Sequence, residues 1–248
     1  MQLRVTGLVL CCTIVLNGCG GSSTSTPLPS SGSGTARARF VEAAPELEAL
    51  IDGVPTQLDS VYLRVNGQTL ASSFDYGTIT QYFEMPPGTA TLSALDTSGY
   101  RVGPLRSPGL SAGKRYTLIL LGSYPNYSVL AYEEPPASAG AQLSLYEASP
   151  TVPKAEFGTF AASAHSHFEQ LGSASLGSIS TVALGKHVTN VGGYVAAAGG
   201  RLGTVSPSQL NSFDRHNELP FHSITRLSLF LFDPISQGAN PVFGSLDQ

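Results

Sequence analysis

The sequence predicts an all-β protein in which two tandem β-sandwich domains follow a signal peptide and a flexible tether. Three observations predict this fold: apolar and polar residues alternate in short runs, Gly, Pro and Asn recur between the runs, and two stretches of the chain repeat. Patterns typical of helices are scarce. A hydrophobic content of 42% over 248 residues, with only 12% charged residues, suffices for a large packed core.

Residues 1–18 are predicted to be a lipoprotein signal peptide. The basic Arg4 precedes an apolar run, residues 5–16, that suits an export signal and falls short of the ~20 residues that a membrane-spanning helix needs. The segment Leu16–Cys19 resembles the lipobox of bacterial lipoproteins, in which the chain is cut before the cysteine and the thiol is acylated. We therefore expect a lipid on Cys19. Ordinary secretion with cleavage nearby is the alternative.

Residues 19–35 are predicted to be a flexible tether. They consist of Gly, Ser, Thr and Pro apart from Cys19 and one leucine, and such a composition cannot bury enough apolar surface to offset the entropy lost on ordering. Gly20 stands where an aspartate retains lipoproteins at the inner membrane in some bacteria, so we expect an anchor in the outer membrane of the cell envelope. Cys11 and Cys12 leave with the signal peptide, so no disulfide is expected in the mature chain.

Three pairs of segments repeat in the remainder of the chain, and the pair that begins at Leu70 and Leu171 matches only loosely. Ala36–Pro45 matches Ala141–Pro150, because both place a large apolar pair before a Glu-Ala dipeptide and end in proline. Arg115–Gly122 matches Arg226–Asp233, and each is an apolar run that suits the last buried strand of a unit. The sequence therefore predicts two related units.

The boundary between the units is placed at a proline-rich stretch. Glu133–Ala141 combines proline with small residues, as linkers between domains commonly do. The first β-sandwich domain is predicted to cover residues 36–134, and the second, more divergent domain is predicted to cover residues 141–248.

Local patterns predict hairpins and buried strands. In residues 61–65 every second side chain is aliphatic, and Asn66-Gly67 supplies the positive φ angles of a type I′ hairpin turn. The Pro86–Gly88 corner predicts a second hairpin, because proline cannot continue a central strand. The apolar runs at 115–122 and 226–231 are predicted to be central strands that are buried on both faces. A helix of one or two turns is predicted over Glu46–Ile51.

The first unit resembles the family catalogued as domain of unknown function 4397, over Ala36 to about Glu133. The motifs that carry the resemblance are Phe40–Pro45, the strand into Asn66-Gly67, Tyr76–Thr78, Pro87–Thr89 and the Ala112–Lys114 turn. The resemblance implies an exported bacterial protein with an immunoglobulin-like fold. It implies no activity and supplies no catalytic residues. The second unit departs from the pattern, since it has no Asn-Gly turn and carries an insertion around residues 206–220.

All five histidines lie in the second unit, and two of them have a spacing that suits a metal site. His165 and His167 are two residues apart, so on a strand both imidazoles project from one face. A divalent metal such as zinc then needs a third ligand, for which the candidates are Asp214, His216, Glu218 and His222. The simpler interpretation is that these histidines are exposed residues of strands and loops that bind no metal.

Tyr124 and Tyr127 flank a Pro-Asn turn, where exposed rings stack on a sugar or on a partner protein. The alternative is that these tyrosines cap the core of the sandwich. The chain contains no tryptophan, which weakens the case for a carbohydrate platform, because the indole offers the largest flat apolar face.

These features favour a non-enzymatic, lipid-anchored envelope protein that serves as a binding, adhesive or scaffold module. We expect no catalytic residues and no cofactor, and a membrane contact through the lipid with an envelope protein or a glycan as partner. A net charge of −4 without clusters of Lys and Arg argues against nucleic acid as a partner. The alternative is a metal-dependent hydrolase that uses the histidines of the second unit.

Overall fold

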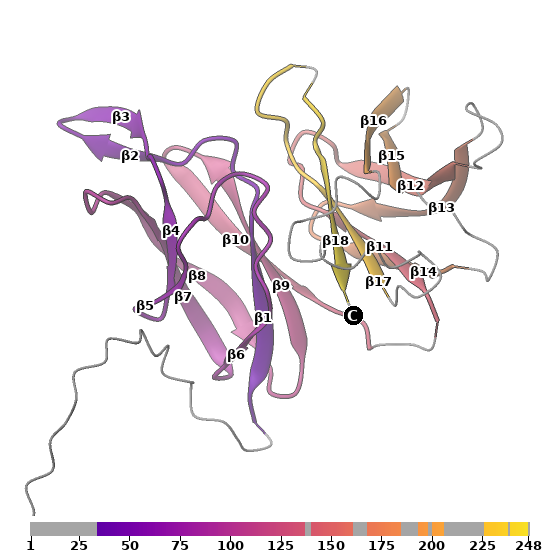
Figure 1. Ribbon diagram of the computed structural model, residues 1–248, viewed down its shortest axis with the longest axis horizontal. Helices are drawn as coiled ribbons and strands as arrows, with labels where there is room; N and C mark the ends of the chain where they lie inside the picture. Colours follow the sequence, from indigo (N-terminus) through magenta and orange to yellow (C-terminus); the bar gives the residue numbers. More distant parts are fainter. Residues whose placement is uncertain are drawn as a thin grey trace, which may run out of the picture. The chain divides into compact units, whose positions relative to one another are not determined.

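The computed structural model describes residues 34–136, 140–160, 168–184, 193–197, 200–205, 226–237 and 239–247 (Figure 1). Every regular element within these ranges is a β-strand, so the predicted all-β class is confirmed. No helix in the described part is long and apolar enough to cross a bilayer. The described residues belong to one compact unit.

The first sandwich pairs two four-stranded sheets, with strand orders β10-β9-β1-β6 (the β9 sheet) and β5-β4-β7-β8 (the β7 sheet). Strands β2 and β3 form a separate hairpin (Figure 1). The strands are β1 (Ala36–Glu42), β2 (Glu48–Ile51), β3 (Val54–Gln57), β4 (Tyr62–Val65), β5 (Gln68–Ala71), β6 (Phe83–Met85), β7 (Gly88–Leu95), β8 (Arg101–Leu110), β9 (Arg115–Ser123) and β10 (Asn126–Glu133).

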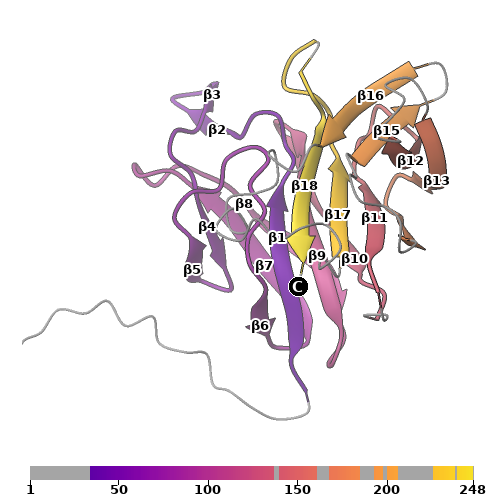
Figure 2. The same ribbon diagram turned by 45° about the vertical axis from the view of Figure 1, so that its right-hand side comes forward.

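The second sandwich also pairs two four-stranded sheets, with strand orders β14-β11-β17-β18 (the β17 sheet) and β13-β12-β15-β16 (the β12 sheet). Figure 2 shows β17 between β11 and β18. The strands are β11 (Gln142–Glu147), β12 (Lys154–Phe160), β13 (Phe168–Ser175), β14 (Ile179–Ala183), β15 (Gly193–Ala197), β16 (Gly200–Val205), β17 (Arg226–Leu231) and β18 (Val242–Asp247).

The repeated segments occupy matching places in the two sandwiches. Strands β1 and β9 pair in parallel, with Arg37 opposite Arg115, and strands β11 and β17 pair in parallel, with Gln142 opposite Arg226. An antiparallel strand then pairs with the second member of each parallel pair. Strand β10 pairs with β9, and strand β18 pairs with β17. The same sheet topology therefore recurs at the predicted repeats, while the domain boundaries at 134 and 141 stay a prediction.

The central strands are buried on both faces, as predicted from their apolar runs. Along β9, Leu118 and Leu120 point into the first sandwich, whereas Ile119 and Leu121 join a separate apolar cluster on the opposite face. Strand β17 alternates in the same way between the core of the second sandwich and that separate cluster. The cluster is shared because the outer faces of the β9 sheet and the β17 sheet pack on each other. We call this contact the sheet interface.

Aromatic side chains form the centre of the sheet interface. Tyr146 stacks on Phe230 with ring centroids 4.6 Å apart, and Tyr132 meets Tyr146 edge to face at 5.6 Å. The Tyr132 hydroxyl donates a hydrogen bond to the backbone carbonyl of Glu147 on the other side. Removing these apolar faces from water stabilises the pairing by roughly 25 cal/mol per Å² buried.

Of the two predicted hairpins, the one at Asn66-Gly67 is confirmed and the one at Pro86–Gly88 is wrong. Asn66 and Gly67 join β4 to β5 with φ angles of 50° and 83°, which confirms the predicted hairpin. The hairpin predicted at Pro86–Gly88 is wrong, because β6 pairs with β1 whereas β7 pairs with β4 and β8. Two consecutive prolines that lack N–H groups end the pairing with β1, and the chain crosses to the other sheet.

The helix predicted over Glu46–Ile51 is also wrong. This segment contains β2, which pairs with β3 in antiparallel register. Asp52 and Gly53 connect the two strands with φ angles of 51° and 83°, the conformation of a type I′ turn. The Asp-Gly dipeptide was the signal for a hairpin, and its turn geometry overrides the modest helix propensity of the preceding residues.

We predict that Gly77→Ala destabilises the protein through the sheet interface. Gly77 has a φ of 83°, and a Cβ atom there would lie 2.3 Å from Cε1 of Phe243. Phe243 cannot move freely, since its ring packs against Tyr76 and Phe232. We expect the free energy of unfolding to fall by about 2–4 kcal/mol, from the strain of positive φ together with overpacking.

The matched control is Gly53→Ala, because Gly53 has the same φ of 83° and open space around its Cβ position. Urea unfolding of the two variants separates backbone strain from steric overlap. An equal loss of stability in both variants would contradict the packing of Phe243 on Gly77.

Candidate functional site

Most of the residues predicted to form sites lie outside the described ranges. These are Cys19, the histidines His165, His167 and His216, and the other candidate metal ligands Asp214, Glu218 and His222. Within the described ranges, no three His, Cys, Asp or Glu side chains are placed to hold a metal ion. The zinc site therefore stays a prediction.

The two predicted ligand-binding tyrosines lie at the turn between β9 and β10. The hydroxyl of Tyr127 donates to the carbonyl of Glu46 at 2.9 Å and accepts from the backbone N–H of Glu48 at 2.8 Å, while its ring packs on the core. Tyr124 is half-buried in the turn itself. Tyr127 thus holds the start of β2 against the sandwich, and a role for either ring in ligand binding stays a prediction.

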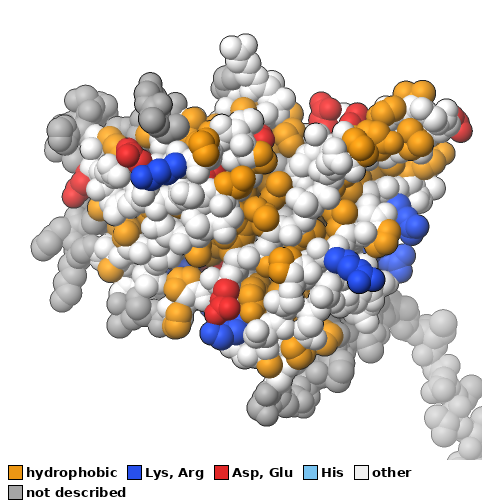
Figure 3. Space-filling view, turned by 180° about the vertical axis from the view of Figure 1, so that it is seen from behind, with side chains coloured by type: hydrophobic (Ala, Val, Ile, Leu, Met, Phe, Trp, Pro, Cys, Tyr) orange, Lys and Arg blue, Asp and Glu red, His pale blue; other side chains and the backbone are white. Residues whose placement is uncertain are grey.

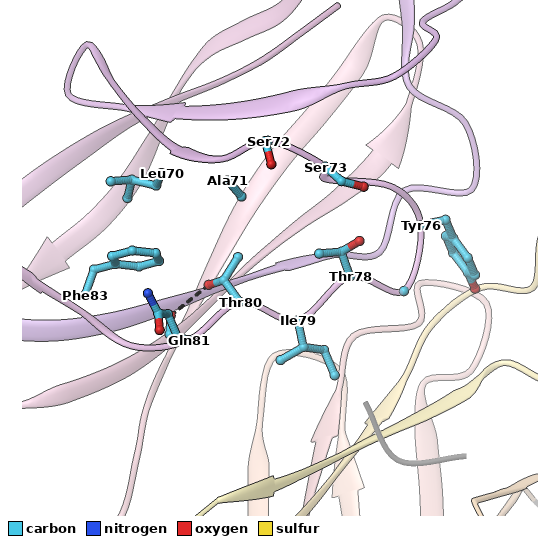
Figure 4. A pocket seen from close by; sticks show the side chains of 11 residues that line it. Leu70, Ala71, Ser72, Ser73, Tyr76, Thr78, Ile79, Thr80, Gln81 and Phe83 are labelled. Carbon is cyan, nitrogen blue, oxygen red and sulfur yellow. Dashed lines mark hydrogen bonds between the residues drawn. The ribbon is translucent and has the colours of Figure 1, made fainter. Parts of the chain in front are cut away.

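A groove of about 520 Å³ opens on the first sandwich (Figure 4). One wall consists of residues 70–73, at and just beyond the end of edge strand β5, and the other consists of residues 76–81 with Phe83, the first residue of edge strand β6. The groove therefore lies between the edges of the β7 sheet and the β9 sheet. The sequence does not reveal this groove, because its residues come from the end of β5, the following loop and the start of β6 without a recognisable motif.

Hydrogen bonds fix the wall formed by residues 76–81. Thr80 accepts a hydrogen bond on Oγ1 from the N–H of Phe40 at 2.9 Å, and the same hydroxyl donates to the carbonyl of Gln81 at 2.9 Å. The Tyr76 hydroxyl donates to the carbonyl of Asp233, at 2.6 Å, which lies beyond β17. The wall is thus held to β1 on one side and to the second sandwich at its end.

Tyr76 is a neutral hydrogen-bond donor at physiological pH. Burial of its phenol, together with the nearby carboxylate of Asp233, raises the pKa of Tyr76 to about 12. The groove accordingly contains hydroxyl, amide and apolar side chains with no nucleophile beside a general base.

A buried group of charges lies at one end of the sheet interface, and Glu134 is at its centre. The Glu134 carboxylate lies 3.4 Å from Arg39, 3.1 Å from Arg226 and 3.6 Å from Arg115. Arg115 and Arg226 are counterparts in the repeat, so Glu134 joins equivalent arginines of the two sandwiches. We call Arg39, Arg115, Glu134, Arg226 and Asp247 the ionic cluster.

Arg39 connects the two sandwiches directly. Its guanidinium donates to Oγ1 of Thr117 on β9 at 2.8 Å and to Oγ of Ser228 on β17 at 3.1 Å. It also forms an ion pair with Asp247 at 2.6 Å and a hydrogen bond to the hydroxyl of Tyr146. The side chain of Arg39 is only 1% exposed, so its charge depends on these partners for compensation.

The environment of Glu134 keeps its carboxyl ionised. Burial by itself disfavours the charged form, but Arg39, the hydroxyl groups of Thr117 and Tyr82, and Arg115 together lower the pKa of Glu134 below its usual value. Glu134 therefore stays charged across the physiological pH range.

Two further carboxyls, Glu42 and Glu147, occupy matching places in the repeats. Oε1 of Glu42 accepts from the N–H of Ala44 at 2.6 Å, and Oε1 of Glu147 accepts from the N–H of Ser149 at 2.9 Å. The second oxygen of each carboxyl is buried without a hydrogen-bond partner in the described structure. Burial raises the pKa of Glu42 well above its usual range, and burial with the charge of Asp233 raises that of Glu147 to about 8.

The described residues define an all-β protein in which two sandwiches share a buried, partly ionic interface. Residues 49–157 match the model of a family described as "Domain of unknown function (DUF4397)". This match supports the predicted family, although it begins in the β2 segment and ends in β12 rather than covering residues 36–133. The assignment of a second copy stays a prediction.

Comparison with solved structures finds the fimbrial anchor protein Mfa2 from Porphyromonas gingivalis, which is 7% identical. The alignment covers 80% of this chain and 90% of that chain with a TM-score of 0.19, which is too low to support an argument about fold or role. None of the curated proteins compared with the chain matches it.

We predict that Glu134→Gln strongly destabilises the protein. The substitution leaves Arg39 and Arg226 buried without their shared counter-charge, and removing one partner of a buried ion pair typically costs about 3–5 kcal/mol. Chemical denaturation followed by circular dichroism measures the loss.

The neighbouring Glu133→Gln provides the control for Glu134→Gln. Glu133 pairs with Lys114, but both side chains are about half exposed, so we expect a change within about 0.5 kcal/mol. Similar stabilities of the two variants would contradict a central role for Glu134.

We predict that stability falls as pH rises, partly through Glu147. Folding raises the pKa of this carboxyl from 4.5 to about 8, so between these values the folded state binds more protons than the unfolded state. The contribution of Glu147 to the free energy of unfolding is therefore complete below pH 4.5 and is lost as the pH rises to about 8. Glu147→Gln, which is neutral at every pH, should flatten this slope in urea unfolding measured from pH 5 to pH 8.

The exposed Glu46→Gln serves as the control and should leave the slope unchanged. A steep decline that persists in Glu147→Gln would assign the effect to other groups, with Glu42 as the first to test.

Proposed function

We propose that the protein is a non-enzymatic, lipid-anchored envelope protein whose two packed sandwiches act as a rigid binding and scaffold module. The observation that carries this proposal is the sheet interface. Apolar faces and an ionic cluster of three arginines and two carboxylates join the β9 sheet to the β17 sheet, so the two sandwiches move together. A body of this kind holds its loops in a fixed geometry.

The groove on the first sandwich is the proposed ligand site. Loops on a rigid sheet scaffold commonly carry binding residues, because they can vary without disturbing the core. The segment 76–81 is fixed to β1 and, through Tyr76, to the second sandwich, so the groove retains its shape before a ligand arrives. Preformed sites of this kind lose less entropy on binding.

The distribution of Lys and Arg on the surface argues against nucleic acid as the partner. On the face shown in Figure 3, Lys and Arg side chains lie in small separate groups, some of them beside Asp or Glu, rather than in one continuous basic patch. Phosphate backbones are bound by clustered Lys and Arg. We propose an envelope protein or a glycan as the partner, with membrane contact through the lipid alone.

The proposed anchor is the acylated Cys19, in the outer membrane of the cell envelope. Cells that express the full chain, grown with labelled palmitate, should incorporate the label into the protein, and the protein should sediment with membranes. Cys19→Ser should abolish both results, because two or more acyl chains are needed for stable anchoring.

Cys12→Ser is the matched control for the labelling experiment, since Cys12 lies within the predicted signal peptide and should be dispensable for acylation. Equal labelling of wild type and Cys19→Ser would refute the lipid anchor.

A further inference from the structure

The side chains that line the groove carry no formal charge. No Lys or Arg is among them, so a phosphate or carboxylate ligand would gain no ion pair. The exposed Asp75, which lies between Ser73 and Tyr76 in the chain, repels anions from the same place. These charges favour an uncharged ligand.

Two polar side chains of the groove are available for hydrogen bonds to a ligand. Ser72 and Gln81 are exposed, and their side chains form no hydrogen bonds with the rest of the described structure. The hydroxyls of Thr78 and Thr80, by contrast, are engaged with the backbone. A purely apolar ligand would cover Ser72 and Gln81 without replacing their bonds to water, at a cost of about 1–3 kcal/mol for each group.

The apolar part of the groove lies at one end. In Figure 4, Leu70 and Phe83 lie near each other at this end, with Gln81 beside them, and Tyr76 lies at the opposite end. Phe83 is held in place by Phe40, with ring centroids 6.3 Å apart. The groove therefore combines a fixed apolar platform with adjacent hydroxyl and amide groups.

We propose that this groove binds a neutral saccharide. This inference rests on the proposed function as a binding module and names the ligand class of the same site. A pyranose ring has one face of C–H groups, which packs on Phe83 and Leu70, and equatorial hydroxyls, which bond to Gln81 and Ser72. A volume of about 520 Å³ lies within the range of small-ligand sites and admits a disaccharide.

The test is a calorimetric titration of the full lipidated chain in micelles of an amine oxide detergent, which has no sugar headgroup. The neutral probes are cellobiose, maltose and N,N′-diacetylchitobiose. The comparison probes are digalacturonate, which is anionic, and the blocked peptide acetyl-Ala-Ala-Ala-amide. We expect saturable binding of at least one neutral disaccharide and none of digalacturonate.

Variants of the two polar side chains locate the binding. Ser72→Ala and Gln81→Ala should each weaken the affinity for the bound disaccharide by about 2- to 10-fold, the value of one hydrogen bond. Gln57→Ala removes an exposed glutamine from β3, away from the groove, and should leave the affinity unchanged. Circular dichroism confirms that each variant is folded.

Three outcomes would overturn the inference: no neutral disaccharide saturates, both groove variants bind as tightly as wild type, or the blocked peptide binds more tightly than every sugar. The last outcome would identify the groove as a peptide site. Each of these results is independent of acylation at Cys19, so failure of the saccharide site and failure of the lipid anchor are distinguishable.

Discussion

The pairing of the Glu134 carboxylate with arginines of both sandwiches is the interaction on which the rest of the structure depends. Arg39 and Arg226 bring two positive charges into a region that excludes water, and such charges are tolerated only beside a counter-charge with further hydrogen bonds. Glu134 supplies that charge at the point where the chain leaves the first sandwich. The sheet interface, the attachment of Tyr76 and the shape of the groove all follow from the sandwiches being held together there.

The two kinds of buried acid at this interface contribute in opposite ways. Glu134 is ionised and compensated, so it fixes the relative position of the sheets. Glu42 and Glu147 lie in less polar surroundings and are stable mainly in their protonated forms. The interface thus contains a part that keeps its charge at physiological pH and a repeated part that weakens as protons leave. Apolar packing between the sheets provides the remaining stability, and this contribution does not depend on the protonation of the acids.

Much of the fold could be predicted from the sequence, because short-range physics determines it. Asn66-Gly67 required a tight turn, and the uninterrupted apolar run of β9 required burial on two faces. The Pro86–Gly88 corner was misread because a break in pairing does not reveal which sheet the next strand joins. The groove and the partners of Arg39 were not predictable, since both depend on how sheets from distant parts of the chain meet. The Glu-Ala dipeptide in both repeats was the available signal for the buried acids.

The repeat is not symmetric at the position of Arg39. Its counterpart in the second sandwich is Ser144, which bonds to Thr181, while Thr117 and Ser228 are counterparts that Arg39 contacts together. Two copies of the first sandwich placed in this way would bring two guanidinium groups into the space that holds one, and two copies of the second would leave Asp247 without a cation. The contact therefore favours a first sandwich beside a second sandwich over two copies of the same sandwich, which disfavours association of neighbouring molecules through like sandwiches.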